Sequence, residues 1–251
     1  MEATFNIILP TSWAELSDKQ LYLIYSLFAR DLSAAEVKTL CLMKWNRLRV
    51  LASLPRHRFL IKRGKEQVVL RTRQIQQATS VLDFLDSFAP MPVRISHIGK
   101  HKAITADFEK VPFEQFLFVE NLFQGYLNTQ SDELLLQMAQ VLYASDHVKP
   151  DKAQLVGIFY WMASLKQYFA GLFSNFYKPA GANSDGNLLG GGQSDLYNQL
   201  RDSTNAMIRA LTGGDITKEA AIMKMDTWRA LTELDAKARE AEEIRKATKQ
   251  S

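Results

Sequence analysis

A glycine-rich stretch late in the chain constrains the architecture more than any other feature of the sequence. Residues 178–193 read KPAGANSDGNLLGGGQ and contain five glycines, a composition typical of a flexible linker. The stretch divides the chain into a body, residues 1–177, and an arm, residues 194–251. The body is long enough to bury a hydrophobic core of its own. The sequence therefore predicts an α-rich globular body and a helical arm that are joined by a flexible linker.

Helix signals dominate the body. Capping boxes, in which two side chains satisfy the free amides of a first helical turn, occur at Ser17–Gln20, Ser33–Glu36 and Asp151–Gln154. Residues 113–127 are apolar on nearly every side, which is typical of a buried helix. Two short segments around Gly64 and Gly99 favour small β-hairpins, formed by residues 59–61 with 68–70 and within residues 93–107. We expect a mainly α fold: a compact helical body with one or two small β-hairpins, then the Gly-rich linker and a C-terminal helical arm.

The longest apolar run, residues 155–177, has the length of a membrane span. Lys166 lies at its middle, where a lysine costs about 2.5–3.5 kcal/mol to insert into a bilayer. Gln167 and Asn175 add further polar groups. The run therefore indicates a buried helix of residues 152–177, and no contact with a membrane is predicted.

The arm lacks enough apolar residues to form a core. Two helices are predicted near residues 195–211 and 216–247, separated by Gly213 and Gly214. The second has one narrow apolar stripe, consisting of Met225, Trp228, Leu231 and Leu234. A single stripe cannot close on itself, so the arm must fold back on the body, self-associate or dock on another protein. We predict that the stripe is a partner-binding site, which lies in a groove of the partner with Trp228 as its main contributor.

Positive charge is concentrated in one window of the body, residues 44–73. The window holds ten Lys and Arg residues and one acid, so its net charge is +9 and the rest of the chain carries −5. Such a cluster attracts phosphate groups and gains affinity by releasing counterions. Three interpretations stay open: a nucleic-acid-binding surface, a dock for an acidic protein, or a solvated face that protects a β edge from aggregation. The residues that would make these contacts are Arg47, Arg49, Arg56, Arg58, Lys62, Arg63, Lys65 and Arg71.

The residues give no indication of catalysis, a metal site or a cofactor. Cys41 lies on the apolar stripe of a predicted helix, where it is expected to be a core side chain. His97 and His101 have a metal-ligand spacing, but Gly99 lies between them and a structural zinc site needs four ligands. Residues 190–192 lack the spacing and the preceding strand of a phosphate-binding loop. We therefore predict a non-enzymatic protein with no catalytic residue, metal or cofactor.

Cysteine usage and the first residues indicate a reducing compartment. One cysteine cannot form an internal disulfide bond. Residues 1–10 lack the basic start and the long apolar run of a signal peptide. The expected location is the cytoplasm.

Several segments resemble proteins of Bacteroidetes genomes and their prophages, some of which lie among tail genes. The segments are LPTSWAELSDKQL and AAEVKTLCLMKW near the start, PFEQFLFVENLFQGYL in the middle, and ALTGGDITKE and DTWRALTELDAKAREAEE near the end. The layout of an α-rich body with a tethered helical arm is also similar to a phage tail-assembly chaperone. Such proteins cover the apolar helices of a tape-measure protein until tail-tube subunits replace them.

The resemblance implies a phage or prophage assembly or structural component, located in the host cytoplasm or in the virion. Its partner would be a tape-measure or other tail protein, or a second copy bound through the arm. The function predicted from the sequence is therefore protein–protein interaction through the C-terminal arm. The alternative is nucleic-acid binding through the basic residues 44–73.

Overall fold

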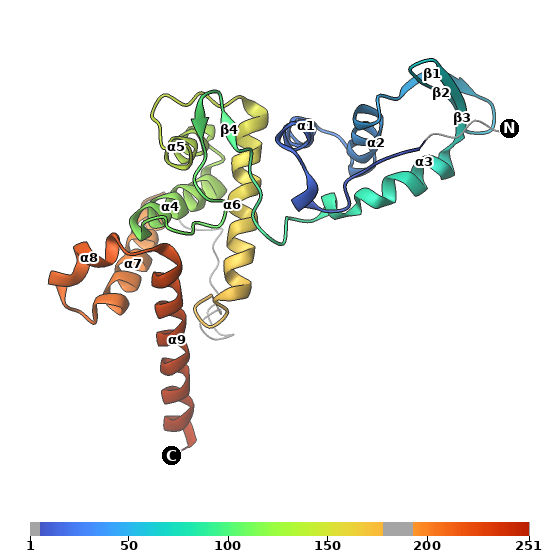
Figure 1. The fold of residues 1–251 in the computed structure, drawn as a ribbon. Helices are drawn as coiled ribbons and strands as arrows, with labels where there is room; N and C mark the ends of the chain where they lie inside the picture. Colours follow the sequence, from blue (N-terminus) through green and yellow to red (C-terminus); the bar gives the residue numbers. More distant parts are fainter. Residues whose placement is uncertain (1–5, 178–192, 251) are drawn as a thin grey trace.

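The computed structural model of the protein describes residues 6–177 and 193–250. This part of the chain is mainly helical, with a three-stranded antiparallel sheet and a two-stranded hairpin, which confirms the predicted fold class. The molecule is elongated (Figure 1). An N-terminal lobe that contains the sheet lies at one end, a long helix stands in the middle, and the C-terminal helices lie beyond it.

The N-terminal lobe begins with short helices around a small core. Its helices are η1 (Trp13–Glu15), α1 (Asp18–Phe28), α2 (Ala34–Trp45), α3 (Thr72–Thr79) and η2 (Ser80–Asp86). The predicted capping boxes at Ser17 and Ser33 are present at the starts of α1 and α2. Trp13, Ile24 and Cys41 belong to the buried cluster between these helices, so Cys41 is the core side chain that its stripe predicts.

A three-stranded sheet follows α2. Its strands are β1 (Arg49–Leu54), β2 (Arg58–Arg63) and β3 (Glu66–Arg71), in the order β1-β2-β3. The predicted hairpin corresponds to β2 and β3, and the β2–β3 turn contains Gly64 with a φ of 59°, as expected. The strand β1 is an addition to the prediction. In the turn that connects β1 to β2, the residues with positive φ are Arg56 and His57. Because this turn contains no glycine, the sequence does not predict it.

The sheet is covered on one side only. Ile61, in the middle of β2, is buried against Leu42 and Leu48, and Phe59 and Leu70 pack around the same cluster. Side chains on a strand alternate between the two faces. The other face of the sheet, which we call the outer face, therefore points away from α2.

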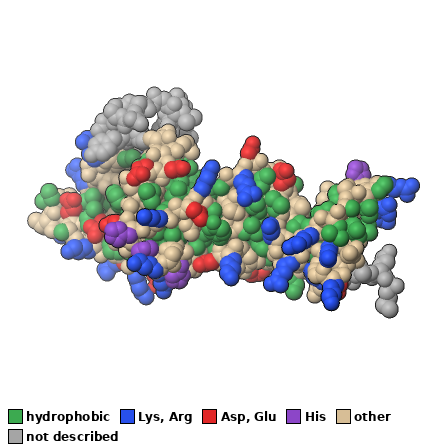
Figure 2. Space-filling view, turned by 90° about the horizontal axis from the view of Figure 1, so that it is seen from above, with side chains coloured by type: hydrophobic (Ala, Val, Ile, Leu, Met, Phe, Trp, Pro, Cys, Tyr) green, Lys and Arg blue, Asp and Glu red, His purple; other side chains and the backbone are tan. Residues whose placement is uncertain are grey.

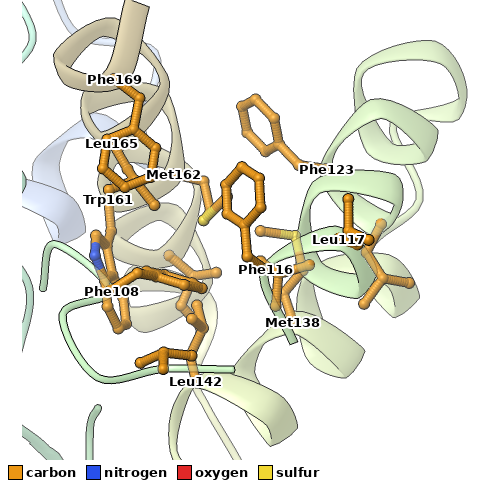
Figure 3. Close-up of a cluster of buried hydrophobic side chains, with 14 of the residues drawn as sticks. Phe108, Phe116, Leu117, Phe123, Met138, Leu142, Trp161, Met162, Leu165 and Phe169 are labelled. Atoms are coloured by element: carbon orange, nitrogen blue, oxygen red, sulfur yellow. The ribbon is translucent and has the colours of Figure 1, made fainter. Parts of the chain in front are cut away.

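The rest of the body, after the N-terminal lobe, is built from three long helices and a short hairpin. The helices are α4 (Phe113–Thr129), α5 (Asp132–Leu142) and α6 (Lys152–Leu172), and the hairpin consists of β4 (His97–Ile98) and β5 (His101–Lys102). Figure 3 shows Phe116 and Phe123 of α4 and Met138 and Leu142 of α5 facing Trp161 of α6 across the core. The core thus lies between α4, α5 and α6, as their apolar composition predicts.

Helix α6 is the buried helix that the apolar run predicts, although it ends at Leu172 instead of residue 177. Its mid-run Lys166 forms an ion pair with Glu120 of α4, so the charge is matched inside the protein. Among the described residues, no helix combines the length and the apolar character that a membrane crossing requires.

Helix α1 of the N-terminal lobe packs directly against α6, which belongs to the rest of the body. The contact is close because position 157 is a glycine: a Cβ there would lie 2.8 Å from Cδ2 of Tyr25. The Tyr25 ring is completely buried, and its hydroxyl has no hydrogen-bond partner among the described residues. The two parts therefore share one packed interface rather than a loose hinge.

The arm contains α7 (Gln193–Thr212), η3 (Ile216–Lys218), α8 (Glu219–Met223) and α9 (Thr227–Gln250). Of the predicted linker, only Gln193 lies within the described residues, and it begins α7. The arm folds back on the body, which is one of the three outcomes that its narrow stripe allows. The second half of α9 extends past the body (Figure 1), and nearly all side chains after Arg239 are exposed.

Candidate functional site

The predicted partner-binding stripe of the arm lies inside the chain's own core. Leu231 and Leu234 are buried, and Met225 and Trp228 pack against the same cluster as α4 and α6. The indole of Trp228 meets the rings of Phe169 and Phe173 edge-on, at centroid distances of 5.8 and 5.9 Å. The stripe is therefore packed against the body of the same chain. In this conformation it is not accessible to a separate partner.

Backbone contacts fix the start of α9 to the loop before α4. The amide of Phe113 donates to the Met225 carbonyl at 2.8 Å, and the amide of Thr227 donates to the Val111 carbonyl at 2.9 Å. The indole NH of Trp228 donates to the Asp107 carbonyl at 2.8 Å. The sequence showed that the stripe needs cover, but not which residues supply it.

The structure divides the predicted basic residues among three places. Four of them, Arg49, Arg58, Lys62 and Arg71, have side chains on the outer face of the sheet. Arg47, Arg56 and Lys65 lie in the connections at the ends of the strands. Arg63 lies on the inner face, where it pairs with Glu66 at 3.6 Å and donates to the Asn6 carbonyl at 2.7 Å.

The outer face has an ordered pattern of charge. Directly opposite residues give three rows across the strands: Arg49–Lys62–Gln67, Ala52–Leu60–Val69 and Leu54–Arg58–Arg71. An apolar middle row thus lies between two rows that each carry two cations. Arg58 and Lys62 are four residues apart on β2, so the cationic rows are separated by about 14 Å. Figure 2 shows Lys and Arg side chains together with apolar side chains at this end of the molecule.

The cations of the outer face have no ion-pair partner among the residues that the structure describes. Within residues 6–177 and 193–250, none of the four makes an ion pair. Glu66, the one acid of the basic window, is directed to Arg63 on the other face. The outer face is therefore a continuous cationic surface with an apolar centre.

Two like-charged pairs lie directly across the strands. Arg49 faces Lys62, and Arg58 faces Arg71. Like charges directly opposite each other on one face destabilise a sheet, and a small sheet that is covered on one side has little stability to lose. Residue pairs that lower the stability of their own sheet are expected at functional sites. The sequence signal for this face is the order basic, apolar, basic at every second position of β2, in Arg58, Leu60 and Lys62.

The structure also gives the surroundings of the one cysteine and of the candidate metal ligands. Burial raises the pKa of the Cys41 thiol to about 12, so the thiol stays protonated at neutral pH and lacks the thiolate of a nucleophilic cysteine. Residues 6–177 and 193–250 contain no group of three His, Cys, Asp or Glu side chains that could hold a metal ion. His97 and His101 lie on β4 and β5, on either side of the Gly99 turn.

Comparisons of the chain with protein-family models, with curated proteins and with solved structures found no match. The assignment of function therefore depends on the surfaces of the molecule itself.

Proposed function

We propose that this chain is a non-enzymatic interaction protein that binds an acidic protein surface through the outer face of its sheet. The observation that carries the proposal is the arrangement of Arg49 opposite Lys62 and Arg58 opposite Arg71, with no counterion for any of the four among the described residues. A bound partner with carboxylates over both rows would remove the repulsion. The surface thus replaces the arm stripe as the proposed binding site.

The apolar middle row favours a protein over a nucleic acid as the partner. Leu60 and Val69 lie between the cationic rows, and Val69 is 44% exposed. Protein partners bury such side chains in the centre of an interface, with charged groups at its rim. Single-stranded nucleic acids bind to exposed aromatic rings, and the one aromatic residue of the strands, Phe59, is on the inner face.

Nucleic-acid binding is the second candidate function, because four cations on one face attract phosphate groups regardless of the base sequence. In that case the apolar row would contribute little to binding, and affinity would decline steeply with salt.

The biological setting that we propose is the assembly of a phage or prophage particle, with a tail component as the partner. This setting is supported by the resemblance of the segments at residues 9–45, 112–127 and 210–243 to prophage proteins. It would place the protein in the host cytoplasm during assembly or in the finished virion.

The two candidate functions can be separated by photo-crosslinking in cells that express the chain. A photoreactive residue replaces Val69 on the outer face, and a matched control replaces Gln76, an exposed residue of α3. We expect crosslinks from position 69 to a protein segment rich in Asp and Glu, lost when Arg58 and Arg71 are both changed to Glu. Crosslinks to nucleic acid from position 69, or equal crosslinking from position 76, would contradict the proposal.

A further inference from the structure

A groove between α4 and α5 carries the opposite charge pattern to the outer face of the sheet. The groove is shallow, with a volume of about 830 Å³. Its acidic residues are Glu114 at the start of α4, Glu133 in the first turn of α5, and Asp146 in the loop after α5. Phe118 and Val141 supply apolar surface between them.

In the described part of the chain, the acids of this groove have no ion-pair partner and its central ring is not covered. Glu114, Glu133 and Asp146 make no ion pair with any residue that the structure describes. Phe118 is 51% exposed, although its neighbours Leu117 and Val119 are buried. An exposed phenylalanine bordered by carboxylates is typical of a surface that binds a partner, because binding removes the apolar ring from water.

The groove and the outer face of the sheet match in pattern. Each has an apolar centre bordered by unpaired charges, cationic on the sheet and anionic at the groove. Figure 1 shows the sheet at one end of the elongated molecule and the α4–α5 pair beyond α6, on the side away from the sheet. The two surfaces of one chain therefore cannot meet, whereas the sheet of one copy can meet the groove of the next.

We propose that this protein associates with itself head to tail, with the outer face of one copy bound in the α4–α5 groove of another. The proposal rests on the proposed function, because it names the acidic partner of the sheet as a second copy of the chain. In such an arrangement a bound pair still offers one free sheet and one free groove, so the copies form a ring or an open filament.

The contact is small and depends on charge. Three strands of six residues cover roughly 20 by 15 Å, which is well below the area of a typical stable complex. Association should therefore be weak, because interfaces of this size are typical of transient contacts. It should be visible at about 0.05 M salt and lost near 0.5 M, where the Debye length is shorter than 5 Å.

Sedimentation velocity of the full-length protein tests this inference. At low salt the wild-type chain should grow in mass with concentration beyond 28.5 kDa, and at high salt it should sediment as a monomer. A sheet variant, Arg58→Glu with Arg71→Glu, and a groove variant, Glu114→Lys with Glu133→Lys, should each stay monomeric at low salt. The control variant, Lys224→Glu with Arg245→Glu, changes exposed charges elsewhere and should still associate.

Mixing the two monomeric variants gives the decisive result. The intact groove of the sheet variant meets the intact sheet of the groove variant, so an equimolar mixture should associate at low salt although neither variant associates alone. The reversed sheet and the reversed groove are also opposite in charge, so the mixture should form dimers and larger species. Thermal unfolding of each variant should stay close to that of the wild type, which shows that the chains fold.

The outcomes also separate this inference from the proposed function. A wild-type chain that stays monomeric at low salt, while position 69 still crosslinks to an acidic segment of another protein, overturns the self-association and retains the proposed function. Self-association that persists in both variants, or a mixture that does not dimerise, also overturns it. Crosslinks from position 69 to nucleic acid would count against both.

Discussion

The like-charged pair of Arg49 and Lys62 predicts a conflict between the stability of the sheet and the binding of its partner. The two residues are directly opposite on the outer face, and neither makes another ion pair among the described residues. Lys62 lies on the central strand and makes no hydrogen bond with its side chain among those residues. Its replacement therefore changes the charge of the sheet with little other effect.

The change Lys62→Glu turns a repulsive cross-strand pair into an attractive one. A directly opposite pair contributes about 0.2–1 kcal/mol, and like charges cost a similar amount, so the variant should stabilise the sheet by about 0.5–1.5 kcal/mol. Lys62→Gln, which only removes the repulsion, should give a smaller gain. Both gains should decrease with salt, since these side chains are in contact with solvent.

Hydrogen exchange of the β2 amides measures this local stability. The amides should exchange about 2- to 12-fold more slowly in Lys62→Glu than in the wild type, the equivalent of the expected gain in free energy. Self-association and crosslinking from position 69 should weaken at the same time. Faster exchange in both variants, or unchanged exchange with weaker binding, would refute the argument that the sheet sacrifices stability for binding.

Three further predictions concern the core and the docked arm. Trp228→Ala should lower the free energy of unfolding by about 3 kcal/mol in a urea titration. Trp228→Phe should lower it by about 1 kcal/mol, because the phenylalanine keeps most of the packing and loses only the hydrogen bond to the Asp107 carbonyl. Equal losses in the two variants would contradict this account. Tyr25→Phe removes a buried hydroxyl that has no partner among the described residues, so the same titration should show a gain of about 1 kcal/mol, and a loss would mean that the hydroxyl is bonded. Burial alone would raise the pKa of Asp235, but its bonds from Asn175 and from the Phe176 amide outweigh that effect and hold the pKa below its ordinary value. A carboxyl group with a lowered folded pKa stabilises the fold above its ordinary pKa and loses that contribution as the pH falls through the folded value. Protease resistance of the 227–250 helix should therefore decline on the acid side of the ordinary Asp pKa in the wild type and show a weaker pH dependence in Asp235→Asn.

The helices were predictable because their signals are local. The capping boxes at Ser17, Ser33 and Asp151 each involve residues three apart, and each is present in the structure. The turn at Gly99 was predictable for the same reason, since a positive φ there needs a glycine. The strand β1 was not predictable, because the turn after it places Arg56 and His57 at positive φ, which is uncommon for these residue types.

The candidate site was predictable only in part. Composition located the positive charge, but the division between the two faces of the sheet depends on register, which placed Arg63 inward beside Glu66 and Lys62 outward. The docking of the arm depends on a surface assembled from distant segments. Phe169 and Phe173 lie more than 50 residues before Trp228, so no local pattern connects them.

The docked arm has a consequence for the way the protein is made. The Val111 carbonyl binds Thr227, which follows it by 116 residues, so the groove over Phe169 stays uncovered while about a quarter of the chain is still to be synthesised. Contacts between such distant residues form late, because a long loop must close before they contribute. During that interval the nascent body exposes an aromatic surface that the mature protein hides. The arm therefore acts as an internal cover, and a chain that ends before residue 227 should be prone to aggregation.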